Sequence, residues 1–511
     1  MNHSTSQSSL SRRSFLKWTA AAGAALAATD WRSALAAEAG LAGKRPNIIV
    51  VLTDDQGYGD IAANGNPKIK TPSMDLMRAE GVRFEDFHVS PTCSPTRCSL
   101  MTGRHEMKSG VTHTIMERER MSLKATTVAQ VLKSAGYATG IFGKWHLGDE
   151  ADHWPDKRGF GEMFIHGCGG IGQSYPGSCG DAPGNSYFSP TILHNGKFEK
   201  TDGYCTDVFF GQATKWIDEK RKAGAPLFAY ITPNAPHGPL NCPEEYVKKY
   251  EGQGLTPQEM AFFGMITNID DNLGRLLAKL KEWGIEKNTL VIFMNDNGGT
   301  AGVKFFNAGM RGGKNTPYNG GTRAASFWRW PGTLKPAAVD KLTMHRDIFP
   351  TLAELAGAKV PEDVAAKLDG RSLAPLLADP AAAWPDRYVF THVGRWPKGK
   401  AAESKYAGCS VRSPRYNMVS PAKGGGEVKW ELYDLKADPG ETKDVAAEHG
   451  DVVKEMSAAY DKWWDEILPC LENEDAVGPA VNPFKELYRK QFGGGPTESD
   501  QPKQGRKGKK Q

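Results

Sequence analysis

The chain has 511 residues, of which 39% are hydrophobic and 24% are charged, as in ordinary soluble globular proteins. Most of the formal net charge of +5 lies at the two ends, because residues 1–36 and the segment from Gly493 each carry +3. Subtracting both ends leaves about −1 for the body, which argues against a broad nucleic-acid-binding surface.

The first 36 residues are predicted to be a twin-arginine export signal. Arg12-Arg13 precedes a short apolar run rich in alanine, and a small-x-small cleavage site ends at residue 36. Asp30 and Arg32 interrupt this run, which is therefore too short to be a transmembrane anchor. No later segment is long and apolar enough to cross a bilayer. We expect a periplasmic or secreted protein, with the export machinery as a partner and no membrane span in its mature form.

Four short apolar runs are predicted to be strands buried on both faces of a parallel sheet. They are residues 47–52, 137–142, 226–231 and 290–294. Helix-like segments lie between them, at 127–134 and at 259–283, where apolar residues recur at helical spacing. This alternation predicts an α/β fold with a doubly wound, mostly parallel sheet.

Polar residues follow each of these four strands. In doubly wound sheets, ligands bind beyond the carboxyl ends of the strands, so these residues are expected to meet at one edge. The set comprises Asp54, Asp55, Lys144, His146, His237, Asp296 and Asn297. Any one of them alone is typical of a turn or a helix cap, but the repetition at four strand ends favours a site. Its carboxylate and amide oxygens suit calcium or magnesium, and its lysines and histidines suit an anionic substrate and proton transfer.

A cysteine in an unusual setting follows the first of these strands. Ser94 is a typical helix cap and Pro95 a typical first helical residue, so a short helix is predicted over 96–101, ending near Gly103. Cys93 then stands just before a helix N-terminus, which favours a negative charge. A reactive thiolate is out of place beside a carboxylate-rich site, because soft sulfur suits neither calcium nor magnesium.

The segment around Cys93 resembles the signature of the type I sulfatases, C-x-P-S/T-R followed by T-G-R. Here it reads CSPTR and then LMTGR, with Thr96 in place of the commoner serine. Four further segments resemble motifs of that family: GKWHLG at 143–148, DNGG at 296–299, GGKNTPYNGG at 312–321 and the LYDL…DPGE hairpin at 432–441. The resemblance covers residues 45–465. It implies the alkaline phosphatase-like fold of that superfamily and an arylsulfatase-like hydrolase of sulfate monoesters.

The resemblance implies that Cys93 is oxidised after translation to Cα-formylglycine, whose hydrate attacks sulfur. The partner it implies is a cytoplasmic formylglycine-generating enzyme, which acts on the unfolded chain before the folded protein is exported. The family also implies one divalent cation, Ca²⁺ rather than Mg²⁺. Its expected ligands are position 93 and Asp54, Asp55, Asp296 and Asn297.

The same resemblance assigns roles to the remaining polar residues. Proton transfer is expected of Asp296 at the attacking hydroxyl, His237 at the leaving oxygen and His146 during sulfate release. Charge stabilisation is expected of Lys144 and Lys314 at the sulfate oxygens, and of Arg97 at the side chain of position 93. Lys144, His237 and Lys314 are thus also expected to contact the substrate.

A second, smaller unit is predicted after the catalytic domain, which we place at 45–384. Strand-like runs at hairpin spacing indicate an antiparallel sheet, and residues 452–467 are typical of an amphipathic helix. The runs are 388–392, 417–419 and 430–433. This α+β unit is expected to span 385–490. The segment 493–511 is glycine-rich, then polar and basic, and is predicted to be disordered.

Fewer signals bear on the substrate. Candidate contacts are His113, the loop from Cys168 to Cys179 with Tyr175, and the segment from His392 to Trp396, whose arginine and tryptophan suit a sulfated sugar. Each is equally compatible with ordinary packing, and Cys168 and Cys179 could form a disulfide in an exported protein. We expect a sulfated saccharide or an aryl sulfate. The alternatives are a phosphonate or phosphodiester hydrolase of the same fold, and an inactive, glycan-binding relative.

Overall fold

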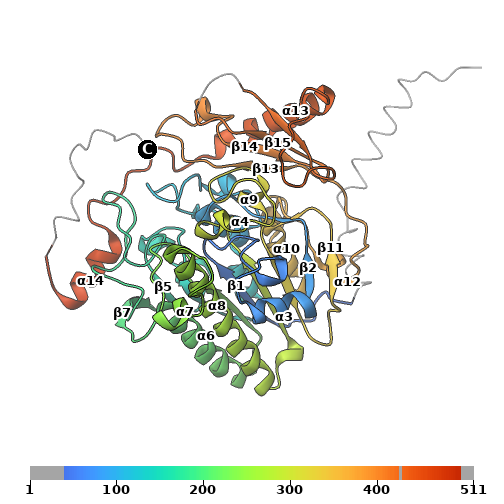
Figure 1. The fold of residues 1–511 in the computed structure, drawn as a ribbon. Coiled ribbons are helices and arrows are strands. Elements are labelled where there is room, and N and C mark those ends of the chain that lie inside the picture. The colour runs from blue at the N-terminus through green and yellow to red at the C-terminus, as the bar shows by residue number, and fades with distance from the viewer. Residues whose placement is uncertain (1–39, 425–427, 496–511) are drawn as a thin grey trace, which may run out of the picture.

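The computed structural model describes residues 40–424 and 428–495. A ten-stranded sheet forms its centre, in the order β11-β2-β10-β9-β1-β8-β4-β5-β6-β7 (Figure 1). The predicted export signal at 1–36 lies outside the described residues, as does the predicted basic tail beyond its first three residues.

The middle of the large sheet consists of parallel strands. The four predicted runs are confirmed as β1 (Asn47–Thr53), β4 (Ala138–Lys144), β8 (Leu227–Thr232) and β9 (Thr289–Asn295). They pair in parallel in the order β9-β1-β8-β4, and β5 (Glu162–His166) extends the parallel set. Every residue of β1, β8 and β9 is buried, as expected for strands covered on both faces.

Shorter strands at both sides make the sheet mixed. On one side β10 (Ser326–Arg329) pairs antiparallel with β9 and with β2 (Val82–Phe84), and β11 (Ala337–Val339) follows β2 in parallel. On the other side β6 (Thr191–His194) and β7 (Lys197–Lys200) add two antiparallel strands. These strands have three or four residues each, fewer than the usual five or six, and the sequence patterns did not predict them.

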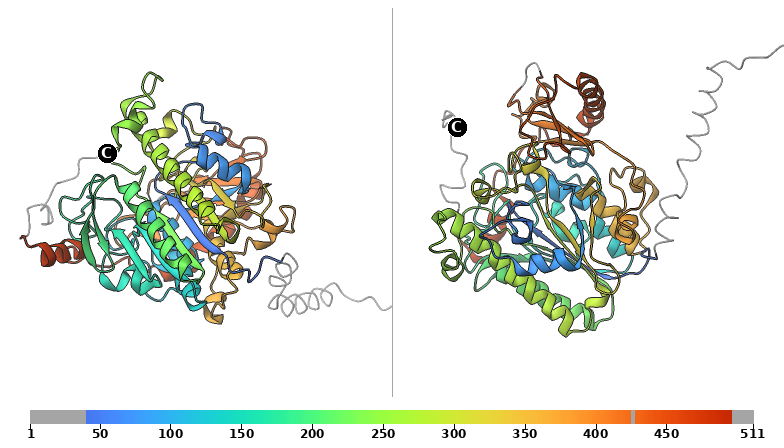
Figure 2. Two further views of the ribbon diagram at one scale, coloured as in Figure 1. Left: turned by 90° about the horizontal axis from the view of Figure 1, so that it is seen from below. Right: turned by 45° about the vertical axis from the view of Figure 1, so that its right-hand side comes forward.

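Helices cover both faces of the sheet, so the doubly wound architecture is confirmed (Figure 2). Alternate residues of β1 enter two separate cores, with Ile48 and Val50 in one and Ile49 and Val51 in the other. The first core includes residues of α4 (Cys93–Thr102), α5 (Val128–Ser134) and α10 (Ile348–Leu355). The second includes residues of α3 (Pro72–Glu80), α6 (Cys205–Lys222) and α8 (Pro257–Glu282).

The helix at Cys93 begins earlier than predicted. Cys93 is itself the first residue of α4, and Pro95 lies within the first turn. Ser94 is not the cap, because its hydroxyl donates to the carbonyl oxygens of Glu119 and His146. The predicted end is confirmed, since Gly103 caps the helix with a φ of 66°, which favours glycine.

The smaller unit is a four-stranded antiparallel sheet with one long helix packed on it (Figure 1). Its strands are β13 (Val389–His392), β14 (Cys409–Arg412), β15 (Tyr416–Ser420) and β16 (Glu431–Asp434), of which β14 was not predicted. The helix α13 (Gly450–Ile467) buries Tyr460, Trp463 and Trp464 against this sheet. The remaining short elements are β3 (Phe87–His88), β12 (Thr343–Met344), α7 (Glu244–Lys248), α9 (Asn319–Thr322), α11 (Glu362–Ala365) and α12 (Ala374–Ala378).

The last described helix returns to the large sheet. Phe484 of α14 (Pro483–Phe492) packs against Phe198 of β7 and Trp154, and Gln491 exchanges two hydrogen bonds with the backbone of Phe198. Within the predicted second unit at 385–490, α14 thus packs on the large sheet and not on the smaller one.

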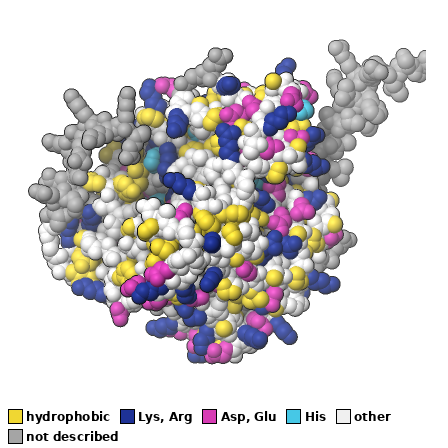
Figure 3. Space-filling view, viewed as in Figure 1, with side chains coloured by type: hydrophobic (Ala, Val, Ile, Leu, Met, Phe, Trp, Pro, Cys, Tyr) yellow, Lys and Arg dark blue, Asp and Glu magenta, His cyan; other side chains and the backbone are white. Residues whose placement is uncertain are grey.

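The surface agrees with the near-neutral body of the sequence. Lys and Arg side chains are interspersed with Asp and Glu over the face drawn in Figure 3. Among residues 40–424 and 428–495, no helix has the length and apolar character needed to cross a membrane.

Replacing Phe484 tests the attachment of α14. Phe484 is 1% exposed, so Phe484→Ala is expected to lower the free energy of unfolding by about 3 kcal/mol through the cavity it leaves. Phe492 on the same helix is 43% exposed and serves as the control. Denaturant titration of both variants measures the difference, and equal stability would show that α14 is not anchored by this contact.

Candidate active site

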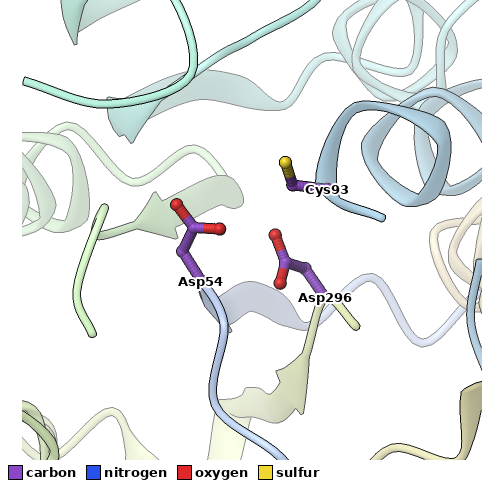
Figure 4. A group of neighbouring side chains, drawn as sticks. All are labelled: Asp54, Cys93 and Asp296. Carbon is purple, nitrogen blue, oxygen red and sulfur yellow. The ribbon is translucent and has the colours of Figure 1, made fainter. Parts of the chain in front are cut away.

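Side chains from three distant parts of the chain meet at the carboxyl edge of the large sheet. One ligand atom each of Asp54, Cys93 and Asp296 lies within 4.8 Å of the other two, and the three side chains point toward one another in Figure 4. The parallel register pairs Thr53 of β1 with Asn295 of β9, so the aspartates that follow them are neighbours. The convergence expected from the strand ends is therefore present.

Each carboxylate at this edge has one cationic partner. Lys144 Nζ donates to Asp54 Oδ2 at 2.7 Å, and Arg97 Nη2 donates to Asp296 Oδ2 at 3.0 Å. Lys314 donates to Asp55 Oδ1. These side chains are between 0% and 12% exposed, so the charges are balanced within a region that excludes water.

Two oxygens in this cluster lack a partner among the described residues. Asp54 Oδ1 and Asn297 Oδ1 are buried and accept no hydrogen bond. Asn297 Nδ2 donates to Asp55 Oδ1 at 3.0 Å, which fixes the amide so that its oxygen is the free atom. Burial raises the pKa of Asp54 to about 6 against the effect of Lys144, and burial with Asp54 raises the pKa of Asp296 to about 7. Buried, unpartnered carboxylate and amide oxygens fit a divalent cation, which Asp54, Asp55, Asp296 and Asn297 would hold.

Cys93 lies at the start of α4 and is only 2% exposed. Burial raises the pKa of its thiol, but the charges of Lys144 and Lys314 outweigh that effect, and its pKa lies below the usual value. Arg97, one turn later, is fully buried and also donates to the backbone oxygen of Lys144 at 3.1 Å. Arg97 therefore ties α4 to the end of β4 and to Asp296. Cys98 is a buried helix residue whose pKa is raised by burial, as expected for a packing residue.

His146 presents one ring nitrogen as an acceptor. Its Nε2 lies 2.7 Å from the carbonyl oxygen of Thr114, so Nε2 carries the hydrogen and donates it. Its Nδ1 is buried and has no partner among the described residues. Burial and then the charge of Lys144 hold the pKa of His146 well below the usual value, so the ring is neutral. A neutral imidazole with a free Nδ1 lone pair is suited to accept a proton.

His237 has the opposite arrangement. Its Nδ1 donates to the carbonyl oxygen of Gly238 at 2.7 Å, and its Nε2 lies 3.9 Å from Asp55 Oδ2. Burial lowers the pKa of His237, and the charge of Asp55 opposes that effect. Because Nδ1 already carries a hydrogen, Nε2 is an acceptor in the neutral ring and donates only when the ring is protonated.

A cavity of about 340 Å³ opens over these residues. Cys93, His146, His237 and Lys314 line its floor. Its other lining residues are His113, Thr114, Ile115, Gly169, Gln173, Tyr175, Asn315 and Arg395. The structure thus brings His113, Tyr175 and Arg395 to the same cavity as the strand-end residues.

His392 does not line this cavity. It is buried in the smaller unit, where its ring stacks on Trp464. Its Nε2 donates to the carbonyl oxygen of Ser404, and its Nδ1 accepts the backbone N–H of Gly394. Both ring nitrogens are therefore used, and the expectation that His392 contacts the substrate is not supported by its position.

The loop between Cys168 and Cys179 forms one wall of the cavity. The two thiols are free and contact each other, so the disulfide considered from the sequence is not formed in this structure. Asp149 holds both ends of the loop, since its two carboxylate oxygens accept the backbone N–H groups of Cys168 and Gly180 at 3.0 and 2.8 Å.

Sequence reasoning missed Asn315 and Thr114 in the cavity wall, whereas Gln173 lies within the loop from Cys168 to Cys179 that it named. Asn315 follows Lys314 in the GGKNTPYNGG segment and has a φ of 68°, a left-handed value that favours glycine. Asp55, His146 and Arg395 share this left-handed backbone, with φ values of 69°, 60° and 61°. Such conformations in residues other than glycine cost about 1–2 kcal/mol each and concentrate at functional sites.

Comparison with protein families agrees with this geometry. The sulfatase family model matches residues 46–358, and a model described as N-sulphoglucosamine sulphohydrolase, C-terminal, matches residues 313–463. A twin-arginine translocation signal matches residues 9–29, so the chain carries an export signal that directs it to the periplasm or beyond.

Similar proteins include human arylsulfatase A, which is 32% identical over 80% of this chain and 85% of its own. Dog N-acetylgalactosamine-6-sulfatase is 31% identical over 72% of this chain and 73% of its own. Among solved structures, Ps i-CgsB in complex with k-i-k-neocarrahexaose has a TM-score of 0.71 and 28% identity, covering 82% of this chain and 93% of that chain. The chain therefore belongs to the type I sulfatase family, whose members generally use formylglycine and a divalent metal, and it is a sulfatase.

Proposed function

We propose that this sulfatase cleaves sulfate monoesters with a nucleophile derived from Cys93 by oxidation to Cα-formylglycine, assisted by one divalent cation, Ca²⁺ rather than Mg²⁺. The observation that supports this most directly is the burial of Cys93 among balanced carboxylates, lysines and unpartnered hard oxygens in one cavity. Once in place, the modified residue supplies a hydroxyl nucleophile and the cation supplies Lewis-acid polarisation.

A sulfated saccharide is the substrate class we favour. Two of the similar proteins bear names that refer to saccharides, a sulfatase of N-acetylgalactosamine and a structure in complex with a neocarrahexaose. The cavity of about 340 Å³ has room for a sugar residue, and its walls are mainly polar side chains that suit hydroxyl groups. Aryl sulfates serve as assay substrates for the same reaction.

Lys144 and Lys314 bind the sulfate oxygens in this proposal. In the structure they are held by Asp54 and Asp55. Asp54 and Asp55 would hold the cation, and Lys144 and Lys314 would then be available to an anionic substrate. Arg97 stays on Asp296 and keeps the carboxylate oriented toward position 93.

Proton transfer is assigned to three residues. Asp296, whose carboxylate lies beside Cys93, is placed to accept the proton of the attacking hydroxyl. His146 accepts a proton at Nδ1 during sulfate release, because its Nε2 is committed to Thr114. His237 acts on the leaving oxygen through Nε2, the nitrogen that is not bound to Gly238.

Modification of Cys93 has to precede folding. The thiol is 2% exposed in the folded protein, which leaves no room for a second enzyme to reach it. A formylglycine-generating enzyme in the cytoplasm acts on the extended chain, and the twin-arginine route then exports the folded product. This order explains why a protein with a buried modified residue uses an export route that carries folded proteins.

Mass spectrometry tests the modification directly. Trypsin releases residue 93 in the peptide 84–97 and Cys98 in the peptide 98–104. The first peptide of the active protein is expected to be about 18 Da lighter than its thiol form, because a thiol becomes an aldehyde. The second is the internal control and keeps its thiol mass. An active preparation with an unmodified 84–97 peptide, or full activity in Cys93→Ala, refutes the proposed nucleophile.

Chelation tests the cation. Removing divalent ions is expected to abolish sulfate-ester turnover and to lower the melting temperature, since an ion at one hundred times its Kd stabilises the folded state by about 2.7 kcal/mol. Added Ca²⁺ restores both. Asp54→Asn is expected to lose the thermal response to Ca²⁺, whereas Asp218→Asn, which removes a surface ion pair, retains it. Unchanged turnover after exhaustive chelation contradicts the proposal.

Replacing Lys314 tests the sulfate-binding charge. Lys314→Ala is expected to lower kcat/KM for 4-nitrophenyl sulfate by about 10²–10³-fold, because a preorganised charge is lost at the developing negative oxygens. Lys304→Ala, an exposed lysine on a neighbouring segment, is expected to leave kcat/KM unchanged. A similar effect of both variants excludes a specific role for Lys314. The wild-type protein also distinguishes the alternative function. A higher kcat/KM for an aryl phosphodiester than for 4-nitrophenyl sulfate favours the phosphodiester hydrolase.

A further inference from the structure

A second cavity adjoins the active-site cavity at the boundary between the two units. It has a volume of about 530 Å³, and Asn315 and Arg395 line both cavities. One wall comes from residues 315–318 of the catalytic domain and the other from the smaller unit, including Pro397, Lys400 and Lys423. A ligand that reaches beyond the active site in this direction has to pass Arg395.

The backbone at Arg395 is held in an unfavourable conformation. Gly394 and Arg395 both have left-handed φ values, of 67° and 61°. Gly394 is required there, because a Cβ atom would lie 2.1 Å from the carbonyl oxygen of Thr112. Arg395 is not glycine, and the conformation costs it about 1–2 kcal/mol. Its N–H donates to the Thr112 oxygen at 3.0 Å, and Arg118 holds the Trp396 carbonyl oxygen at 2.6 Å, so neighbouring contacts fix the turn.

The guanidinium of Arg395 has few hydrogen-bond partners. Its Nη2 donates to Thr114 Oγ1 at 2.8 Å, and its Nε is buried without a partner in the described part of the chain. Two other arginines pair with carboxylates: Arg97 in the active site with Asp296, and Arg118 near this boundary with Glu474 at 3.1 Å, although each also has one buried donor without a partner. No described carboxylate forms an ion pair with Arg395. A cation with an unused donor therefore faces the passage between the cavities.

His113 adds a neutral donor beside this charge. Its Nδ1 accepts the backbone N–H groups of Thr114 and Ile115 at 2.8 and 3.1 Å, which leaves the hydrogen on Nε2. Burial and then the charge of Arg395 lower the pKa of His113 to about 3, so the ring stays uncharged. A cationic fork and an imidazole N–H lining one cavity form a set that recognises the oxygens of an anion.

We propose that Arg395 is a specificity residue that binds a second anionic group of the substrate, a carboxylate or a second sulfate, one sugar position away from the sulfate that is cleaved. This inference rests on the proposed function, because it places the first sulfate at position 93. The second cavity then holds the neighbouring sugar, with Lys400 and Lys423 in its wall. The favoured substrate is thus a saccharide with at least two anionic groups.

Saccharide binding to the full-length Cys93→Ala protein tests the role of Arg395, because this variant does not turn the saccharide over. Calorimetry is carried out with two pairs of saccharides that differ by one anion. The disaccharide of N-acetylgalactosamine 6-sulfate with glucuronic acid is compared with the same disaccharide in which glucose replaces glucuronic acid. That glucose-containing disaccharide is in turn compared with its form that carries a second sulfate on the glucose. In at least one pair the dianionic member is expected to bind about tenfold more tightly or better, as for hydrogen bonds to charged groups. The pair that shows the difference identifies the second anion as a carboxylate or a sulfate.

Three further variants of the Cys93→Ala protein complete the test. Arg395→Gln is expected to abolish the difference in affinity within the responsive pair. Arg395→Lys is expected to retain part of that difference, because the positive charge remains. Lys454→Gln removes one charge from the exposed face of α13 and is expected to keep the full difference. Melting temperatures confirm that each variant is folded. The proposal is overturned if neither pair shows a difference, or if the difference survives Arg395→Gln. Failure of the wild-type protein to cleave 4-nitrophenyl sulfate counts against the proposed function alone.

Discussion

Charge balance in a water-excluded region is the constraint on which this site depends. Asp54, Asp55 and Asp296 are buried together, and each is paired with one of Lys144, Lys314 and Arg97. Loss of one partner from a buried pair typically costs about 3–5 kcal/mol, because the other charge is left uncompensated. The same balance prepares the site for catalysis. In the proposed function, Lys144 and Lys314 are the charges that an incoming sulfate meets, and both are already in place in the structure.

The large sheet supplies the rigidity that such a cluster needs. Its central parallel strands are buried on both faces and place their following residues within a few ångströms of one another. The surrounding loops then hold Asp55, His146, Asn315 and Arg395 in left-handed conformations that only tight packing maintains. Gly298 shows how tight that packing is, since a Cβ atom there would lie 2.0 Å from the carbonyl oxygen of Gly320. Precise placement of the polar groups is thus achieved by backbone contacts more than by flexible side chains.

The sequence predicted the parts of the site that follow long buried strands. The runs ending at Leu52 and Met294 carry a strong hydrophobic signal, so the aspartates after them could be assigned to one edge. Local rules failed where tertiary contacts took over a side chain. Ser94 was expected to cap α4, but its hydroxyl is used by two distant carbonyl groups. His392 was grouped with Arg395 because they are close in sequence, yet the turn at Gly394 sends one into the core and the other to the cavity. The short edge strands and the packing of α14 on the large sheet could not be predicted, because their sequences carry no hydrophobic pattern as strong as that of the long buried strands.

Thr114 is one of the residues of the catalytic domain that contact the smaller unit. Its carbonyl oxygen orients the imidazole of His146, and its hydroxyl receives the guanidinium of Arg395 from the smaller unit. A shift of Arg395 in the smaller unit is therefore linked to the imidazole of His146 by two hydrogen bonds. Replacing the smaller unit by another one would change the orientation of His146 unless Thr114 kept both contacts.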